Sequence, residues 1–216
     1  MRIACLHTAD SNVAVFDAAA QAIGLAPDVL AHTVRADLLS AAERAGGLTA
    51  AIAAETGAAL QSLCGSANAV VLTCSTLGPS VAALAGTVTV PVLRVDAALA
   101  EAAVANGGRV VALCAVETTV EPTTRLFADA AAMTGAAVEV QLVPGAWELF
   151  KAGARDRYLA AIAKAADDAY TDGASVVVLA QASMAGAADL VRNGPPPLTS
   201  PTAGLAAALR QASQPS

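Results

Sequence analysis

The chain has 216 residues and a formal net charge of −6, a length that suits one large α/β domain or two small lobes. Hydrophobic residues make up 56% of it, but no apolar run approaches the roughly 18 residues that would span a bilayer, so we expect no membrane partner. Basic residues form no stripe and only 3% of residues are aromatic, which argues against nucleic-acid binding. The first residues are typical of a strand and not of a signal peptide, so we expect a cytoplasmic protein.

Short apolar runs alternate with alanine-rich stretches of helical character along the whole chain. Alternation of this kind predicts parallel strands covered by helices, and the nearly all-apolar strands indicate a sheet buried on both faces. The predicted strands are, in chain order, Arg2–His7, Val70–Thr73, Val88–Val95, Arg109–Ala115, Ala137–Val143 and Val176–Ala180.

The two halves of the sequence resemble each other at an offset of 107 residues. This offset pairs Arg2-Ile3 with Arg109-Val110, and it pairs residues 70–72 with residues 177–179 without a gap. A repeat of this length predicts two similar α/β lobes that face one another. The last segment, residues 201–211, is predicted to be a helix that returns to the first lobe. We therefore expect residues 1–96 plus 205–216 in the first lobe and residues 97–204 in the second.

Four side chains fall at the carboxyl ends of the matched strands, where open α/β sheets bind their ligands. The first strand of each half ends at His7 or Cys114, and the other matched strand leads to Cys74 or Gln181. These four positions are the first candidates for a functional site.

Cys74 stands between a predicted strand and a predicted helix, in the run Thr-Cys-Ser-Thr-Leu-Gly-Pro that ends at Pro79. Proline suits a first helical turn, and a thiol beside a helix N-terminus is favoured as the reactive thiolate. The hydroxyls of Ser75 and Thr76 could cap that helix or bind a carboxylate there. The alternative is a buried cysteine followed by an ordinary helix cap.

The run from Val70 to Pro79 resembles the first cysteine motif of the aspartate/glutamate racemase superfamily, which includes glutamate and hydantoin racemases, maleate isomerase and arylmalonate decarboxylase. Further similar segments are His7-Thr8, residues 114–124 and residues 177–185, so the resemblance covers nearly the whole chain. It implies two pseudo-symmetric α/β lobes, each a parallel sheet flanked by helices, with the active-site cleft between them.

The sequence departs from this family at the second cysteine. The resemblance implies two cysteines on opposite faces of the substrate carbon, but the matching position here is Gln181, whose amide only forms hydrogen bonds. Single-cysteine chemistry is therefore the hypothesis, with Cys74 as base, proton donor or nucleophile in a racemase or isomerase that acts on a small carboxylate, such as an amino acid, a hydantoin or a diacid. Two alternatives are a single-thiol decarboxylase, which is a lyase, and a catalytically weakened protein that binds a small carboxylate.

Several other residues are candidates for substrate binding. Thr118 and Thr119 resemble the carboxylate-binding threonines of the family, although a threonine here could equally cap a helix. Asn12 follows the first strand in a loop where many members of the family hold the substrate, and neighbouring residues could simply cap the next helix. Ser183 lies two residues beyond Gln181 and would be a poor base without an activating partner.

Two strand-end residues could supply a second acid or base. For His7, a catalytic role and a structural role bonded to the backbone are both open. Cys114 fits a small buried hydrophobic residue better than a catalyst.

The sequence implies no cofactor and no metal. No glycine-rich nucleotide motif is present, and the four cysteines form no CxxC pair. The two histidines, His7 and His32, lie far apart in sequence and lack ligand-like spacing with cysteine or carboxylate, so we expect no zinc site. Dimers are common among folds of this kind, and a homodimer is compatible with the sequence.

Overall fold

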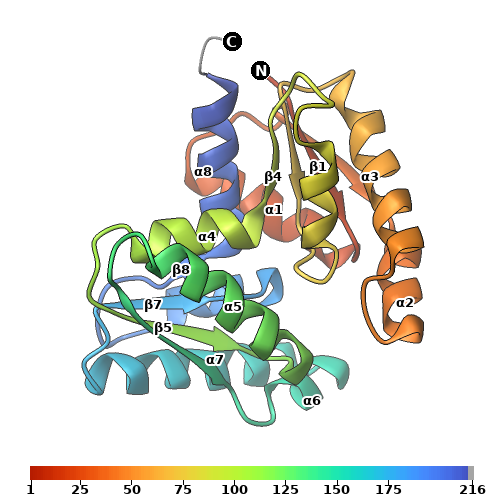
Figure 1. Ribbon diagram of the computed structural model, residues 1–216. Coiled ribbons are helices and arrows are strands. Elements are labelled where there is room, and N and C mark those ends of the chain that lie inside the picture. Colours follow the sequence, from red (N-terminus) through yellow and green to blue (C-terminus); the bar gives the residue numbers. More distant parts are fainter. Residues whose placement is uncertain (214–216) are drawn as a thin grey trace. The chain divides into compact units, whose positions relative to one another are not determined.

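The computed structural model describes residues 1–213 (Figure 1). The chain divides into two compact units, which we call the first lobe (Met1–Ala98 and the segment that starts at Pro201) and the second lobe (Leu99–Ser200). It passes from the first lobe to the second within helix α4 (Val95–Val104) and returns at the start of helix α8 (Ser200–Ala212). Within residues 1–213, no helix is long and apolar enough to cross a membrane.

The first lobe contains a four-stranded parallel sheet in the order β2-β1-β3-β4. Helices and a 3₁₀ helix connect its strands. Besides α4 and α8, its elements are β1 (Ile3–His7), α1 (Ser11–Ala22), β2 (Leu30–Val34), α2 (Ala36–Ala45), α3 (Ala50–Cys64), β3 (Ala69–Leu72), the 3₁₀ helix η1 (Gly78–Leu84) and β4 (Val92–Arg94).

The second lobe repeats this arrangement with a parallel sheet in the order β6-β5-β7-β8. Its elements are β5 (Arg109–Cys114), the 3₁₀ turn η2 (Glu117–Thr119), α5 (Val120–Ala131), β6 (Ala137–Leu142), α6 (Ala146–Lys151), α7 (Arg155–Thr171), β7 (Val176–Leu179), the 3₁₀ helix η3 (Ala182–Leu190) and β8 (Leu198–Thr199).

Equivalent backbone hydrogen bonds relate the two lobes. The Thr73 N–H donates to the Leu6 carbonyl at 3.1 Å, and the Ala180 N–H donates to the Leu113 carbonyl at 3.0 Å. Donor and acceptor are each displaced by the 107 residues of the sequence repeat. The predicted fold class, two lobes that each hold a parallel sheet flanked by helices, is confirmed.

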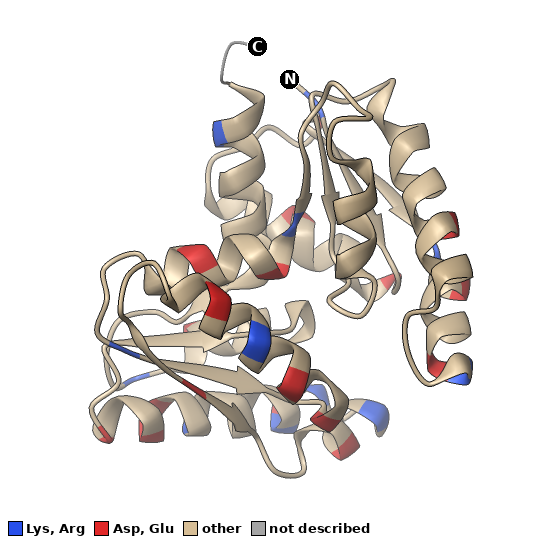
Figure 2. Ribbon diagram, viewed as in Figure 1, with Lys and Arg blue, Asp and Glu red and all other residues tan. Residues whose placement is uncertain are grey.

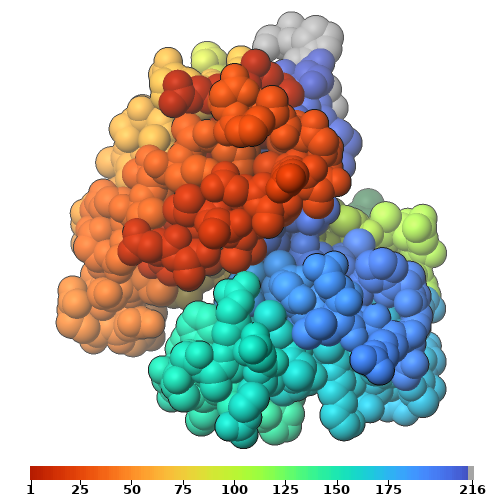
Figure 3. Space-filling model, turned by 180° about the vertical axis from the view of Figure 1, so that it is seen from behind, coloured from red at the N-terminus to blue at the C-terminus, as the bar shows by residue number. Residues whose placement is uncertain are grey.

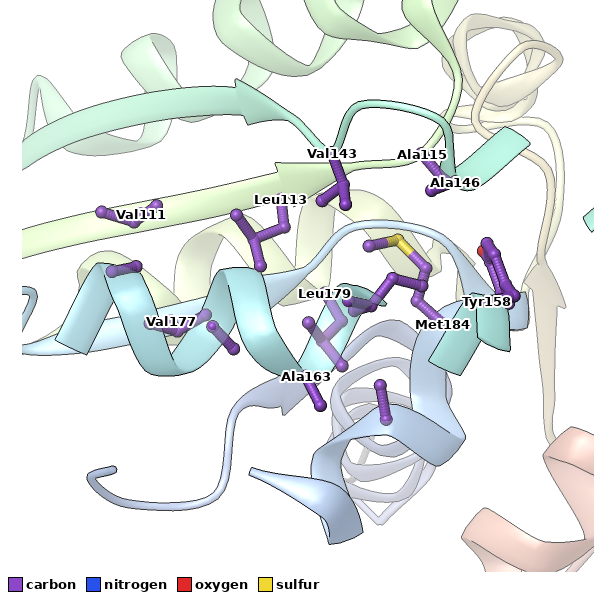
Figure 4. Packing of buried hydrophobic residues seen from close by; sticks show 14 residues of the cluster. Val111, Leu113, Ala115, Val143, Ala146, Tyr158, Ala163, Val177, Leu179 and Met184 are labelled. Carbon is purple, nitrogen blue, oxygen red and sulfur yellow. The ribbon is translucent and has the colours of Figure 1, made fainter. Parts of the chain in front are cut away.

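The central strands are buried because helices cover both faces of each sheet, as their apolar sequences predict. In the second lobe, side chains of β5 and β7 pack against α7, α6 and η3 (Figure 4). In the first lobe, side chains of β1 and β3 pack with those of α2, α3 and η1. These cores hold the carboxyl ends of β1, β3, β5 and β7 in place.

Two strands differ from what the sequence predicts. Strand β2 was not predicted, because His32 and Thr33 interrupt its short apolar pattern and every one of its residues is only half-buried at the sheet edge. The strand predicted over Val88–Val95 covers only Val92–Arg94. It begins after Pro91, which has no N–H to donate to the sheet, although the Pro91 carbonyl accepts from the Val70 N–H at 2.9 Å.

Charged residues are distributed over helices, loops and strands (Figure 2). In this view the described part of the chain shows no stripe of Lys and Arg, in keeping with the negative net charge.

Candidate active site

Cys74 lies just beyond the carboxyl end of β3. The preceding residue, Thr73, is fixed because both its N–H and its hydroxyl reach the Leu6 carbonyl, each at 3.1 Å. The Cys74 side chain is half-buried and packs against the core of the first lobe. Within residues 1–213 its thiol has no hydrogen-bond partner, so it can act on a ligand without first breaking a contact.

The helix after Cys74 differs from the one predicted. It is the 3₁₀ helix η1, and its N-cap residue is Leu77, so the predicted capping by Ser75 or Thr76 is wrong. The intervening residues form a turn in which the Gly78 N–H donates to the Ser75 carbonyl at 3.1 Å. Both hydroxyl side chains are half-buried, and neither has a hydrogen-bond partner among the described residues. They are therefore available to a ligand next to the thiol.

Arg94 also belongs to this region, although no sequence motif indicated it. It is the last residue of β4 and pairs in register with Leu72 on β3, the strand that leads to Cys74. Its Nε and Nη2 donate to the Asp96 carboxylate at 3.0 and 2.7 Å. A Cβ at Gly78 would lie 2.5 Å from the Arg94 Nε, so glycine at this position allows the guanidinium to pack against the turn. The feature of the sequence that could have indicated Arg94 is its position as an arginine at the end of a predicted strand.

His7 is fully buried, and both of its ring nitrogens are in hydrogen bonds. Its Nδ1 lies 2.9 Å from Thr73 Oγ1, and its Nε2 lies 2.9 Å from His32 Nδ1. On the far side of that ring, His32 Nε2 lies 3.0 Å from Asp17 Oδ1. Burial lowers the pKa of His7 to about 4, helped by His32 and opposed by the Asp17 charge. His7 is therefore neutral near pH 7.

The contact between the two histidines overturns the argument that separation in sequence keeps them apart. Strands β1 and β2 are parallel neighbours, so residues 25 positions apart come together.

Gln181 ties together two loops of the second lobe. Its Oε1 accepts from the Ala115 N–H at 2.7 Å, and its Nε2 donates to Thr119 Oγ1 at 2.8 Å. The Thr119 hydroxyl in turn donates to the Val116 carbonyl at 2.6 Å. Thr119 occupies the N-cap position of α5 but its side chain caps no backbone N–H, and Thr118 is exposed. The structure therefore brings two predicted site residues, Gln181 and Thr119, into direct contact.

The remaining candidates have separate surroundings. Ser183 lies 2.9 Å from the hydroxyl of Tyr158, a buried residue of α7 whose pKa burial raises to about 12. Cys114 is buried, which raises the pKa of its thiol, and its Sγ donates to Thr123 Oγ1 at 3.7 Å. Asn12 is half-buried in the first turn of α1.

The model of one family, described as Asp/Glu/hydantoin racemase, matches residues 3–209. The chain belongs to this racemase family. Its solved structural neighbours include an allantoin racemase from Pseudomonas fluorescens, with a TM-score of 0.64 and 20% identity over 97% of this chain and 90% of the other. An aspartate racemase from Picrophilus torridus has a TM-score of 0.70 and 11% identity over 99% of this chain and 94% of its own.

A third neighbour is an aspartate racemase homologue from Pyrococcus horikoshii, with a TM-score of 0.66 and 14% identity over 99% of each chain. At these identities the likeness concerns the fold. No curated protein matches the sequence. Membership of the racemase family supports an enzyme of the racemase or isomerase type.

Proposed function

We propose that the protein is a cofactor-independent enzyme of the racemase family that acts on a small carboxylate through a single thiol, Cys74. The observation that carries this proposal is a difference in hydrogen bonding between the two strand-end loops. Cys74, Ser75 and Thr76 have no side-chain partner within the described residues, whereas Gln181 and Ser183 are hydrogen-bonded inside their own lobe.

The unpaired groups after β3 suit proton transfer next to a carboxylate. In the proposed step a Cys74 thiolate removes a proton from the carbon beside the carboxylate. The C–H bond breaks, an S–H bond forms, and the electron pair moves onto the carboxylate as an enediolate. Hydrogen bonds from the hydroxyls of Ser75 and Thr76 would stabilise this charge. Return of the proton to carbon restores the thiolate, so that no external reagent is consumed.

His7 supports this site indirectly in the proposal. Its contact with Thr73 Oγ1 orients the residue that precedes Cys74. Because both of its ring nitrogens are in hydrogen bonds, we propose a positioning role for His7, in addition to the acid–base role that the sequence suggested.

Gln181 stands at the position where the resemblance to two-cysteine racemases implies a second proton-transfer group. An amide neither removes nor returns a proton near neutral pH, and both ends of this amide are already bonded. We therefore propose one-sided chemistry: exchange of the proton beside the carboxylate, isomerisation through a thiol adduct, or loss of CO₂ followed by protonation.

The test is hydrogen exchange followed by NMR in D₂O. The panel consists of amino acids, hydantoins, maleate-like diacids and substituted malonates. We expect at least one class to take up deuterium, isomerise or lose CO₂ with the wild type, and the rate to fall by at least about 10²-fold in Cys74→Ala because its base is absent. Cys64→Ala is the matched control: it removes a half-buried thiol of α3, and we expect an unchanged rate.

A second function is favoured by the amide at position 181. If neither the wild type nor Cys74→Ala converts any compound of the panel, while one compound raises the melting temperature of both proteins, the chain is a carboxylate-binding protein. The proposed enzyme is then refuted. An activity that survives intact in Cys74→Ala would refute the single-thiol mechanism.

A further inference from the structure

Three potential metal ligands share one face of the sheet in the first lobe. Cys5 and His7 are two residues apart on β1, so their side chains point to the same side of the sheet. His32 is the register partner of Cys5 on the neighbouring strand β2. One ligand atom from each residue, Sγ or a ring nitrogen, lies within 4.8 Å of the other two.

Each imidazole in this cluster is also held by a second partner on its other ring nitrogen. His7 Nδ1 is hydrogen-bonded to Thr73 Oγ1, and His32 Nε2 to the Asp17 carboxylate. Histidine ligands of metals are commonly oriented in this way, with the nitrogen that does not bind the metal bonded to a carboxylate or another oxygen. The two remaining nitrogens, His7 Nε2 and His32 Nδ1, face each other at 2.9 Å.

The placement of hydrogens explains why a cation suits this pair. The Asp17 carboxylate accepts the hydrogen of His32 Nε2, which leaves a lone pair on Nδ1. When the Thr73 hydroxyl donates to the Leu6 carbonyl, His7 must donate from Nδ1, which leaves a lone pair on Nε2. In this tautomer a positive ion between the two nitrogens accepts both lone pairs. Without the ion, the 2.9 Å contact is a hydrogen bond that shares a single hydrogen.

We propose that Cys5, His7 and His32 form a binding site for a divalent transition-metal ion of the zinc type. A thiolate and two imidazoles are a ligand set that zinc favours, with water as the fourth ligand. Tetrahedral zinc places neighbouring nitrogen ligands about 3.3 Å apart, so the two rings need to separate by only a few tenths of an ångström. On binding, Cys5 exchanges its S–H bond for a bond to the metal and releases one proton to solvent.

The cluster is buried under helix α1 but has a connection to solvent. Cys5 and His7 are fully buried, and the ring of Phe16 on α1 packs edge-on against His7. The side chain of His32 is 17% exposed and that of Asp17 is 55% exposed, so the ion can reach the site past these two residues. Seen from behind, segments near the N-terminus form much of the surface of the first lobe (Figure 3).

Bound metal would fasten the edge strand β2 to β1. This inference goes beyond the proposed function, because it concerns the stability of the first lobe and needs no substrate. It also replaces the expectation from sequence that the protein has no metal site.

The test is metal binding by the full-length chain without a histidine tag. Zn²⁺ titration followed by calorimetry should give one tight site per chain, and one equivalent of Zn²⁺ should raise the melting temperature. His32→Gln should lose the tight site, and Asp17→Asn, which changes only the outer partner, should weaken binding about 10- to 100-fold. Cys64→Ser is the matched control and should bind as the wild type does, because its thiol lies on α3 outside the cluster.

Co²⁺ identifies the ligands independently of stability. In the wild type it should show the absorption of tetrahedral cobalt with a thiolate-to-metal charge-transfer band, and Cys5→Ser should lose that band. If Cys5→Ser does not fold, the zinc affinities of His32→Gln and Asp17→Asn decide whether the site exists. The proposal is overturned if the wild type binds neither metal at one equivalent, or if His32→Gln binds as tightly as the wild type. Neither result bears on Cys74, whose activity is measured separately.

Discussion

The two lobes have the same strand order but differ in the polarity of equivalent positions. In the first lobe, one face of the first two strands carries Cys5, His7 and His32. At the offset of 107 residues, Cys5 and His7 correspond to Ala112 and Cys114, and the register partner of Ala112 on β6 is Val140. The fold therefore tolerates either a polar or an apolar set here, and the sheet does not require the histidines.

The loops after β3 and β7 differ in how many hydrogen bonds their side chains make, and here the second lobe has the more polar contacts. In the second lobe Gln181 bonds to the β5–α5 connection and Ser183 bonds to Tyr158, so the loop is fixed by side chains. The equivalent residues of the first lobe, Cys74 and Thr76, have no such partners within the described chain. One copy of the loop is therefore held by its own side chains, whereas the other leaves its thiol and hydroxyl groups without partners among the described residues.

Gln181→Cys should have the largest effect, because it places a thiol at the position that corresponds to Cys74 and that resembles the second cysteine position of the family. If Gln181 is what limits the protein to one-sided proton transfer, this variant should gain racemisation of its exchanged substrate. A positioned acid or base contributes about 10²- to 10⁴-fold in rate. Polarimetry or chiral chromatography of the reaction products measures the gain.

Gln181→Ala provides the control for this gain. It removes the same hydrogen bonds to Ala115 and Thr119 without adding a thiol, so it should show no new racemisation. Equal racemisation in the Ala and Cys variants would mean that loosening of the loop, and not the thiol, is responsible.

Tyr158→Phe tests the fixed loop of the second lobe through its dependence on pH. Burial raises the pKa of Tyr158 from 10.0 to about 12. Between these values the unfolded chain has released the phenol proton and the folded chain has retained it, so stability falls as pH rises from 10 to 12. The loss is about 2 to 3 kcal/mol. In urea unfolding, the free energy of unfolding of Tyr158→Phe should not show this fall between pH 10 and 12. Near pH 7 the variant should be less stable than the wild type by about 1 kcal/mol, because it lacks the hydrogen bond.

Ser183→Ala separates burial from hydrogen bonding in this effect. It removes the partner of the Tyr158 hydroxyl but keeps the buried phenol, and the hydrogen bond from Ser183 acts to lower the pKa of Tyr158. The alkaline loss of stability should therefore be at least as steep as in the wild type. A flattened pH profile in Ser183→Ala would show that burial is not the main cause.

The sequence predicted the features of the fold that follow from the periodicity of apolar residues. It did not predict the features that depend on which strands are neighbours in the sheet. The 107-residue offset predicted both lobes and placed Cys74 and Gln181 at equivalent strand ends, because apolar strands repeat regularly. It missed β2 and hence the contact between His7 and His32, because separation in sequence does not indicate which strands are neighbours. The capping prediction failed because the residues after Cys74 form a turn before η1 begins. The roles of the candidate site residues stay predictions.

Gly204→Ala tests a difference between the two helices that follow the last strand of each lobe. Gly204 in α8 corresponds, at the 107-residue offset, to Ala97 in α4. A Cβ at position 204 would lie 2.5 Å from Val95 Cγ1 and 3.2 Å from the Val95 backbone Cα, so this contact requires glycine. Overpacking costs about 1 to 3 kcal/mol and alanine regains about 1 kcal/mol through helix propensity, which leaves a net loss of up to about 2 kcal/mol.

Thermal unfolding measures this loss as a fall in melting temperature of up to about 8 °C. Gly57→Ala is the matched control, because it is a helical glycine of α3 whose added Cβ would meet nothing within 4 Å. There the change should raise stability by about 0.5 to 1 kcal/mol. A rise in both variants would mean that α8 can shift away from Val95, and its close packing in the first lobe would then not depend on glycine.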